Sequence, residues 1–550
     1  MMSIKKILNT KNKKMDKIDF IILSVIIAFY SVLSFINLGT TSSPWTFLTL
    51  NKEEEITLKL KDKERVENIK FFNGNLSGTY KITSSTNNID YNYIATYKGN
   101  GSFSWNDEKL KANAKYLKIK SLQKSTLGSI TLYDNNLNKI AIDKVISKNK
   151  NKNNLIDEQR KTPKKINYLN SSYFDEIYFA RTAYEYANGL KAYDWVHPPL
   201  GKLIQAIPIK IFNNMSPFFY RLVSNICGIL MIVIMYLFCK QMFLQRKFSI
   251  LGALLMTFDT FHFVQTRIGT IDSILVLFIL LSYFFMYKYI SESNEKYLMF
   301  SGLFFGCATS VKWIGLFAGL GLAIIFFTHV IKNKLISIKL LLKCCVFYIL
   351  IPLVIYIGSY LLFPNVENTY TNSIENIVIQ TKDMYKYHST LNAKHPFSSK
   401  WYTWIVTYKP VWYYQGEVSN NSHGTIVALG NIAIYWLGLI TLLYTIGKMI
   451  IKKDKNSFFI VVGALSLYLP YIFIGRCMFL YHFFPVLPFV MLSIVNLFND
   501  LCKKIKNNIF MYVYIAIVIL VFIIYYPAIS GIKVSNSYLD SIKLFDTWIF

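Results

Sequence analysis

The chain has 550 residues, of which 53% are hydrophobic, 16% are aromatic and only 17% are charged. This composition excludes an ordinary soluble domain, and long runs without charges indicate a polytopic membrane protein. The formal net charge of +29 would favour nucleic-acid binding in a soluble protein. Here most lysines lie in short loops between apolar runs or in one polar block. Membrane orientation and contact with anionic lipid therefore explain the charge better than nucleic acid does.

In chain order, a basic tail at 1–17 precedes the first apolar run, 18–38. That run is long enough to cross a bilayer and no cleavage-site pattern follows it, so we expect an uncleaved transmembrane helix. Further runs bring the predicted total to about eleven transmembrane helices. Those after the first are 217–239, 248–266, 270–290, 297–311, 313–330, 340–362, 426–450, 457–474, 478–498 and 508–528.

Residues 39–146 have a different composition, with alternating runs such as EITLKLK and GSITLYD separated by Asn, Gly and Asp. Period-two alternation between such turns predicts an antiparallel β domain. WTFLTLNKEEEITLKLKDKERVENIKFF followed by GTYKITSS resembles discoidin-like, galactose-binding β-sandwiches. A carbohydrate-binding role and a spacer or protein-contact role both stay open. The Lys/Asn-rich stretch 147–170 is predicted to be a flexible linker.

The distribution of basic residues predicts the orientation. With the basic tail inside, every second loop carries clustered lysines, whereas the short outside turns carry only the isolated Arg267, Lys312 and Arg476. The outer face then holds the loop 171–216, the large loop 363–425 and the tail 529–550, joined by helices at 217–362 and 426–528. Polar residues from separate helices therefore converge on the extracytoplasmic face of a cell membrane, which predicts a site there.

The most informative segment is FDEIYFARTAYEYANGLKAYDWVHPPLGK, which begins at Phe174. Its spacing predicts a helix over 174–188, with Asp175 and Glu176 in the first turn and Gly189 as the stop. Simple capping of the helix dipole is the plain alternative for such an acidic pair. Acids beside a membrane are costly, however, and Asp194 and His197 follow closely, which favours a functional cluster. The next stretch, with a kink expected at Pro208, predicts an amphipathic interfacial helix.

Seven strings in order then resemble protein O-mannosyltransferases, over about 174–500. After the acidic segment they are YRLVSNICG, FDTFHFVQTRIGTIDSILVLF, GCATSVKWIGLFAGLGL, MYKYHSTLNAKHPFSSKWYTWIVTYKPVWYY, ALGNIAIYWLG and LPYIFIGRCMFLYHFFPVLPF. The loop 363–425 has no room for the β-trefoil-type insert of the eukaryotic enzymes, and a β domain precedes the acidic loop. This pattern indicates a bacterial member of the family.

The resemblance implies an eleven-helix GT-C fold and inverting transfer of mannose from a polyprenyl-phosphate carrier to Ser or Thr of exported proteins. A hydroxyl is a poor nucleophile, so a carboxylate must take its proton. By resemblance Asp175 is that base, with Glu176 beside it. Positive charge is needed where the phosphate leaves. The candidates for that role are Arg267, Lys312, Arg476 and His482.

Other residues near these candidates have supporting or structural interpretations. Asp194 and His197 are expected to organise the acceptor side, and Arg221, just inside a membrane helix, is expected to pair with Glu176 or Asp175 rather than with phosphate. Neutralisation of Arg267 by Asp272 across the turn is the plain alternative to phosphate binding by Arg267. The outer loop contributes His395, Lys400 and Trp401, and the irregular histidine spacing argues against a metal site. No cofactor is implied, metal dependence is open, and a dimer is compatible with the sequence.

Three other interpretations compete with this one, and one of them, a membrane-anchored binding protein that works through its β domain, leaves the motifs after residue 170 unexplained. A related GT-C transferase could use another lipid-linked sugar or a lipid or glycan acceptor. A transporter of similar helix count should place polar residues near the bilayer midplane in two related halves. Here the polar residues gather at one face and no internal repeat is found, so transport is disfavoured.

Overall fold

The computed structural model describes residues 14–362 and 374–550. The basic tail predicted at 1–17 and the start of the predicted loop 363–425 lie partly outside these ranges. The chain divides into two compact units: one comprises Met1–Ile36, Asp194–Ile204 and Val223–Phe550, and the other comprises Asn37–Tyr193 and Gln205–Leu222. Each unit is described by itself.

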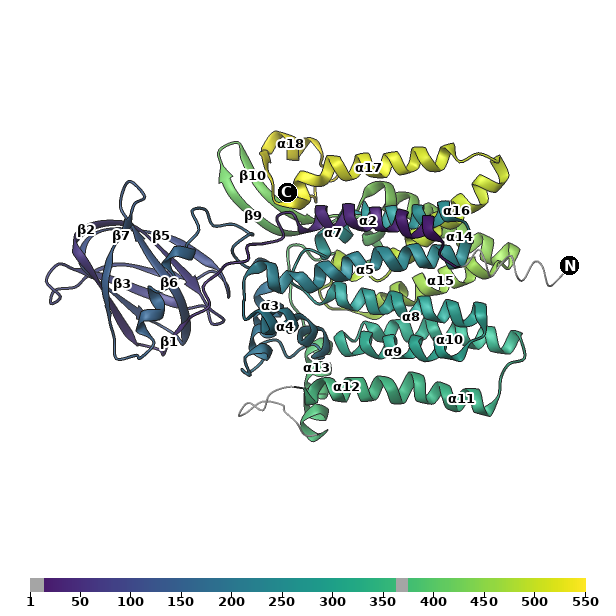
Figure 1. Cartoon of the computed structure of the whole chain (residues 1–550), viewed down its shortest axis with the longest axis horizontal. Helices are drawn as coiled ribbons and strands as arrows, with labels where there is room; N and C mark the ends of the chain where they lie inside the picture. Colours follow the sequence, from purple (N-terminus) through teal and green to yellow (C-terminus); the bar gives the residue numbers. More distant parts are fainter. Residues whose placement is uncertain (1–13, 363–373) are drawn as a thin grey trace. The chain divides into compact units, whose positions relative to one another are not determined.

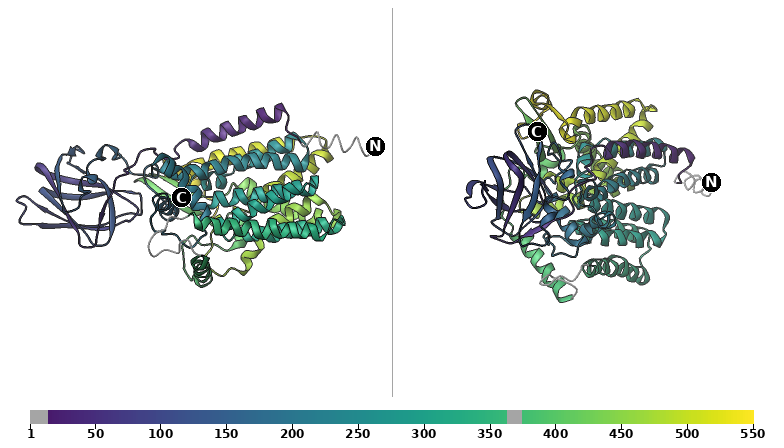
Figure 2. Two further views of the ribbon diagram at one scale, coloured as in Figure 1. Left: turned by 60° about the horizontal axis from the view of Figure 1, so that its bottom comes forward. Right: turned by 60° about the vertical axis from the view of Figure 1, so that its left-hand side comes forward.

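The larger unit is a bundle of long helices that lie roughly side by side (Figures 1 and 2). Its first part contains α2 (Lys17–Phe35), α5 (Pro217–Phe243), α6 (Arg246–Thr257), α7 (Thr260–Gln265), α8 (Asp272–Glu292), α9 (Glu295–Val311), α10 (Gly315–Lys332), α11 (Ile338–Cys345) and α12 (Ile351–Leu361), with the π-turn η3 (Val346–Leu350) between the last two. Its second part contains α13 (Ile374–Thr390), η4 (Trp401–Val406), α14 (Ile432–Lys452), α15 (Lys455–Tyr468), η5 (Leu469–Phe473), η6 (Leu480–Phe483), α16 (Leu487–Ile505), α17 (Ile509–Ser530) and α18 (Asn536–Ser541).

Within the described ranges, eight helical segments are long and apolar enough to cross a membrane. They are Lys17–Phe35, Pro217–Phe243, Asp272–Glu292, Gly315–Lys332, Ile338–Leu361, Ile432–Lys452, Lys455–Phe473 and Ile509–Ser530. The chain is therefore a polytopic helical membrane protein, as the sequence predicts. The other predicted spans are also largely helical: 248–266 is interrupted between α6 and α7, 297–311 corresponds to α9, and 478–498 becomes α-helical only from Leu487.

One predicted helix start is wrong. The run 426–450 was expected to be helical throughout, but residues up to Ala428 belong to the strand β10 (Ser422–Ala428), which pairs with β9 (Val411–Ser419) and with β11 (Lys533–Ser535). The helix α14 begins only after Asn431, whose side chain accepts a hydrogen bond from the backbone N–H of Ala433. An Asn at that position is a favourable N-cap, so the local sequence sets the boundary.

The predicted tail 529–550 is folded onto the same sheet. Trp548 and Phe550 are buried with Val427 and Leu429, and Trp548 donates a hydrogen bond from Nε1 to the carbonyl of Thr407 at 3.0 Å. Its last residues thus help to hold the outer loop that contains β9 and β10.

The smaller unit contains the predicted antiparallel β domain. Its strands are β1 (Leu48–Leu50), β2 (Glu55–Asn73), β3 (Thr79–Ser85), β4 (Asn92–Lys98), β5 (Trp105–Ser121), β6 (Ser125–Tyr133), β7 (Lys139–Ile140) and β8 (Ile142–Ile146). They form one hydrogen-bonded sheet of order β1-β6-β2-β5-β3-β4, with β7 on β6 and β8 on β2. The expected two-sheet sandwich is therefore corrected to a single curved sheet, a half-barrel.

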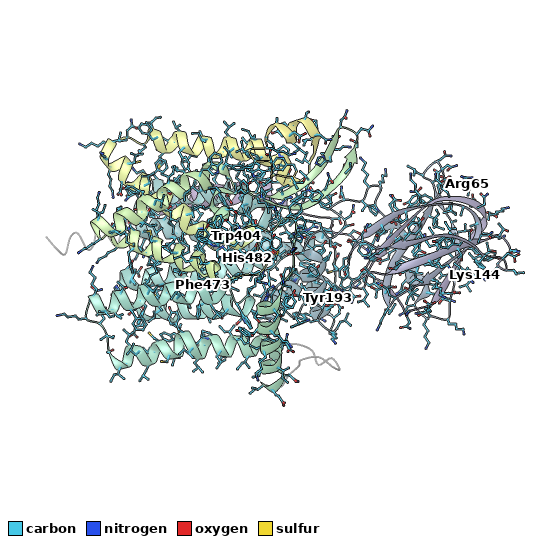
Figure 3. All side chains as sticks on the ribbon, turned by 180° about the vertical axis from the view of Figure 1, so that it is seen from behind. Arg65, Lys144, Tyr193, Trp404, Phe473 and His482 are labelled. Atoms are coloured by element: carbon cyan, nitrogen blue, oxygen red, sulfur yellow. The ribbon has the colours of Figure 1, made fainter. Side chains whose placement is uncertain are left out.

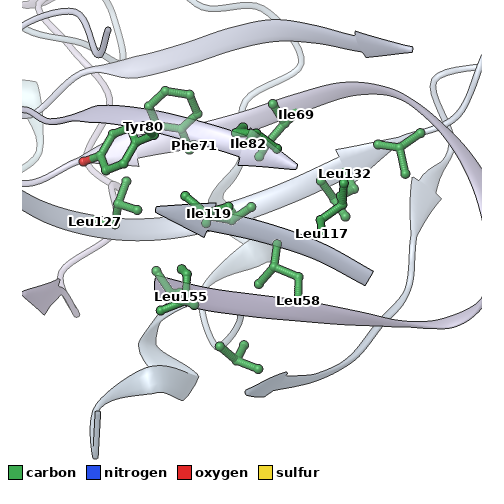
Figure 4. Packing of buried hydrophobic residues seen from close by; sticks show 14 of the residues in the cluster. Leu58, Ile69, Phe71, Tyr80, Ile82, Leu117, Ile119, Leu127, Leu132 and Leu155 are labelled. Carbon is green, nitrogen blue, oxygen red and sulfur yellow. The ribbon is translucent and has the colours of Figure 1, made fainter. Parts of the chain in front are cut away.

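The long central strands explain the curvature. The pairing of β2 with β5 changes register between Lys59 and Glu64 and again between Val66 and Asn68. Such irregularities bend a strand and increase its twist, which lets one sheet wrap around its own apolar face. Leu58, Ile69, Leu117, Ile119 and Leu132 fill that face and are almost completely buried (Figure 4).

The stretch 147–170, predicted to be a flexible linker, is packed on this sheet. It contains the short helices η1 (Lys152–Leu155) and η2 (Gln159–Lys161), and Leu155 is fully buried in the β-domain core. Glu158 accepts hydrogen bonds from the backbone N–H groups of Trp45 and Thr46. The prediction of a flexible linker was therefore wrong. It rested on the polar composition of the stretch, which does not show that Leu155 packs in the core or that Glu158 binds the backbone of another segment.

Candidate active site

The acidic segment forms α3 (Glu176–Ala187), which ends at the predicted place because Gly189 adopts a left-handed φ of +67°. Asp175 occupies the N-cap position, yet its side chain makes no capping hydrogen bond. The side chain of the neighbouring Glu176 accepts a hydrogen bond from the backbone N–H of Tyr173, which precedes the helix, at 3.1 Å. The two acids therefore differ, and capping does not account for Asp175.

Glu176 is fully buried and forms a bidentate pair with Arg221, in the first turn of α5. Nε of Arg221 donates to Oε1 of Glu176 at 2.6 Å, and Nη2 donates to Oε2 at 2.8 Å. Arg221 is itself fully buried and also donates to the carbonyls of Leu38, Tyr168 and Ser171. The pairing predicted for Arg221 is thus observed with Glu176. It ties together chain segments that are distant in sequence, including the turn before α3.

In the larger unit, Asp194 is held by Lys202. Nζ of Lys202, which is fully buried, donates to Oδ2 of Asp194 at 2.9 Å and to the carbonyl of His197 at 3.0 Å. This arrangement fixes the loop before α4 (Leu200–Phe212), the predicted amphipathic helix with Pro208 in its interior. Asp194 therefore organises the loop that presents His197.

The ring of His197 stacks on that of His388 from α13, with centroids 5.4 Å apart. Nε2 of His388 donates to the carbonyl of Val196 at 2.7 Å, so Nδ1 of His388 accepts from Nη1 of Arg476 at 3.0 Å. The carbonyl fixes the tautomer, because only the protonated ring nitrogen can donate to it. A neutral His388 consequently orients the guanidinium of Arg476.

The electrostatics of this cluster are positive. Burial, followed by the charges of Lys312 and Lys202, lowers the pKa of His197 well below its ordinary value. Burial and Arg476 lower the pKa of His388. These two histidines are thus kept neutral by desolvation and by nearby cations.

Lys312 is buried at the turn between α9 and α10 and forms a salt bridge with Asp272 at 2.8 Å. In the sequence analysis, the alternative partner of Asp272 was Arg267, whose charge it would neutralise across the turn. Arg267 donates to the carbonyls of Ser34 and Ile36 at 3.1 and 2.6 Å, where α2 ends. It therefore caps a helix C-terminus, as arginine side chains commonly do, and this use competes with phosphate binding.

His482 lies in η6 and stacks on Trp404 of η4, with ring centroids 5.8 Å apart and planes inclined by 16° (Figure 3). Nδ1 of His482 contacts the carbonyl of Phe479 at 3.0 Å. Its ring is buried, so it helps to shape the segment that precedes α16 and follows Arg476.

A cleft of about 790 Å³ brings together four predicted residues: His395, Lys400, Trp401 and Arg476 line it, and Lys394 lines it as well. No carboxylate is among its described lining residues. In the described part of the chain Arg476 forms no salt bridge, and its hydrogen-bond partner is the neutral His388. The cleft therefore offers positive charge that no acid in its walls neutralises.

Sequence reasoning did not select Lys202, His388 or Trp404 as site residues. Arg476 and His388 are separated by 88 positions, and no local spacing connects them. Lys202 lies in the acidic segment that begins at Phe174, eight positions after Asp194. The opposite charges of these two residues, on either side of Pro198-Pro199, are the sequence signal for their salt bridge.

Comparisons with known proteins agree with the fold. A family profile described as dolichyl-phosphate-mannose-protein mannosyltransferase matches residues 164–363, and one for the C-terminal four-helix region of protein O-mannosyltransferases matches residues 374–548. The chain belongs to the protein mannosyltransferase family. This family is one of glycosyltransferases, and the two matches together include every predicted site residue but leave out the β domain at 39–146.

Similar curated proteins are the polyprenol-phosphate-mannose–protein mannosyltransferases of Mycolicibacterium smegmatis and Corynebacterium glutamicum. The first is 21% identical over 66% of this mannosyltransferase-family chain and 85% of its own length, and the second is 20% identical over 64% and 81%. Among solved structures, the Saccharomyces cerevisiae protein O-mannosyltransferase Pmt1–Pmt2 complex bound to the sugar donor matches with a TM-score of 0.60 at 13% identity. That match covers 69% of this chain and 89% of the yeast chain.

Proposed function

We propose that this enzyme transfers mannose from polyprenyl-phosphate-mannose to Ser or Thr hydroxyls of exported proteins, with inversion, at the extracytoplasmic face of the membrane. The proposal includes an eleven-span GT-C bundle, in which the three helical regions that are short or interrupted also cross the bilayer. Family membership supports the donor class. The lysine distribution along the chain supports the orientation.

In the proposed step, the acceptor oxygen bonds to the anomeric carbon of mannose while the bond from that carbon to the phosphate oxygen breaks. The hydroxyl proton passes to the carboxylate of Asp175 and the polyprenyl phosphate leaves. Attack from the face opposite the leaving group inverts the anomeric carbon. No acid is needed for the leaving group, because a phosphate is already stable as an anion.

One observation carries the donor assignment: Arg476 is held by a neutral histidine in a cleft without carboxylates. A guanidinium with free donors matches phosphate geometry and stabilises the charge that grows as the bond breaks. Lys400 supplies further positive charge in the same cleft, and Lys312 contributes less because it is paired with Asp272. Arg267, bound to carbonyls of α2, is the weakest of the predicted phosphate ligands.

The roles of the acids follow from their surroundings. We assign Asp175 as the base because it stands at the start of α3, in the acidic segment that resembles the first outer loop of the family. Glu176 and Arg221 are positioning residues that fix the start of that helix. Asp194, through Lys202, positions the loop that carries His197.

The test is reconstitution of the purified protein with polyprenyl-phosphate-mannose and a Ser/Thr-containing peptide from an exported protein. We expect hexose on a hydroxyl residue, located by mass spectrometry, and an inverted anomeric configuration by NMR. Polyprenyl-phosphate-glucose is the matched donor control. Faster transfer from that donor, or transfer to lipid or glycan but not to peptide, would favour the related GT-C transferase.

A further inference from the structure

A second cavity lies at the opposite ends of the helices that carry the Lys312–Asp272 pair. Its volume is about 640 Å³, and it is formed where α8, α10 and α14 end and α15 begins. Asp272 starts α8, whereas Ser293, directly after its last residue, lines the cavity. Since α8 has 21 residues, the two sites are roughly 30 Å apart along that helix.

The cavity has a cationic rim and an apolar interior. Lys332, Lys453 and Lys455 are exposed, whereas Ile325 and Phe459 are buried. No carboxylate is among the described residues that line it. Within residues 14–362 and 374–550 these three lysines form no salt bridge, in contrast to Lys448 nearby, which pairs with Asp454 and Asp500.

His329 adds a hydrogen-bond donor to this wall. The side-chain amide of Asn333 donates to the carbonyl of His329 at 2.7 Å and contacts Nδ1 of His329 at 3.3 Å. Because the amide nitrogen points at both atoms, Nδ1 is the acceptor and Nε2 carries the proton. Nε2 is buried and has no hydrogen-bond partner among the described residues. An unsatisfied buried donor is unfavourable in the unliganded protein.

An apolar surface continues from the cavity along α10. A hollow lined by α10 residues shares Thr328 and Lys332 with the cavity, and it shares Ala323 and Phe327 with a further apolar cavity of about 240 Å³. The three spaces form a series with charge at one end and apolar walls along the rest. An amphiphile with an anionic head and a hydrocarbon tail has this distribution of chemistry.

We propose that this series of cavities binds an anionic phospholipid of the leaflet at the lysine-rich end, on the side away from the candidate active site. The phosphate lies among Lys332, Lys453, Lys455 and His329, and an acyl chain follows α10 past Phe327 and Ala323. Membrane orientation alone predicts lysines at these helix ends, and the helix dipole also favours Lys332 and Lys453 at the C-termini of α10 and α14, whereas Lys455 begins α15. Neither reason predicts an adjoining apolar hollow.

The experiment uses the full-length protein in phosphatidylcholine vesicles that contain a trace of phosphatidylglycerol with a photoreactive diazirine on its acyl chain. After irradiation, peptide mass spectrometry locates the adducts. We expect adducts on α10 between Gly319 and Ile331, and on the order of 100-fold less labelling in the triple variant Lys332→Gln, Lys453→Gln, Lys455→Gln, since each lysine near an anionic lipid contributes on the order of 1 kcal/mol.

The matched control is the triple variant Lys503→Gln, Lys504→Gln, Lys506→Gln, which removes the same charge from residues that do not line the cavity. It should label as the unmodified protein does. A second test variant, Ala323→Trp, keeps every lysine and fills the apolar hollow, and it should also lose the adducts. Equal labelling by a diazirine phosphatidylcholine, or unchanged labelling in either test variant, would overturn the proposal.

Discussion

Arg221 and Arg476 are two arginines in opposite surroundings. Arg221 is fully buried, binds both oxygens of Glu176 and donates to three backbone carbonyls. Arg476 is half-buried, lines a cleft and is oriented by a neutral histidine. A cation whose donors are all used by the protein stabilises architecture, whereas a cation that the protein orients but does not neutralise is available to an anionic ligand.

Asp175 and Glu176 show the same contrast in adjacent positions. Glu176 accepts from Arg221 and from the backbone of Tyr173, as a structural carboxylate does. Asp175 makes no capping bond although it stands at the N-cap, where an aspartate side chain is most favourable. The bidentate pair therefore makes Glu176 a structural residue, and the proposed base is its neighbour Asp175.

The largest expected effect is on stability, from Glu176→Gln. Removing one charge of a fully buried pair leaves Arg221 uncompensated, which should lower the free energy of unfolding by about 3–5 kcal/mol. Thermal unfolding in detergent measures it. Glu67→Gln is the matched control, because its partner Arg65 is 57% exposed, and such pairs contribute about 0–1 kcal/mol. Equal shifts in Tm for the two variants would remove the contrast.

A smaller free-energy change, seen in activity, is expected from Arg476→Gln. Losing a charge-assisted contact to the donor phosphate, worth about 1.5–3 kcal/mol, should raise the KM for the lipid donor about 10- to 150-fold. Tm should stay close to that of the unmodified protein, because no carboxylate depends on this cation. Arg65→Gln serves as the charge-matched control. An unchanged donor KM, or a loss of Tm as large as that of Glu176→Gln, would make Arg476 a structural residue.

The third effect is a pH dependence of stability around the basic cluster. The folded-state pKa values of His197 and His388 are lowered. The unfolded chain binds their protons near pH 6.5, so the free energy of unfolding should fall as the pH drops below about 6.5. His388→Gln preserves one donor and one acceptor, and should make the decline in Tm between about pH 7.5 and 5 shallower. An identical slope in both proteins would exclude a contribution of His388.

Much of the architecture was predictable because it is local. Apolar runs gave the membrane helices, the spacing after Phe174 gave α3, and Gly189 gave its end. The Arg221–Glu176 pair could be anticipated because a buried arginine beside an acidic turn requires a partner. The β domain was predicted from alternation, but its curvature depends on register shifts in β2 that the pattern does not show.

The remaining features depend on contacts between distant segments. His388 acquires its role from Val196 and Arg476, and Asp272 pairs with Lys312 forty positions later. Leu155 and Ile156 are a short apolar pair in a polar stretch, so only the tertiary structure reveals that they pack in the core. Periodicity and composition report neighbours along one element, and they carry no information on such pairings.

The central claim is tested most directly by mannose transfer with purified Asp175→Asn, assayed beside the unmodified protein at saturating donor. We expect kcat to fall by about 10²–10⁴-fold, the usual contribution of a positioned general base. The KM for the donor and the Tm should stay near those of the unmodified protein. Transfer by the folded variant at a near-normal rate would contradict the assignment of Asp175 as the base and the mechanism built on it.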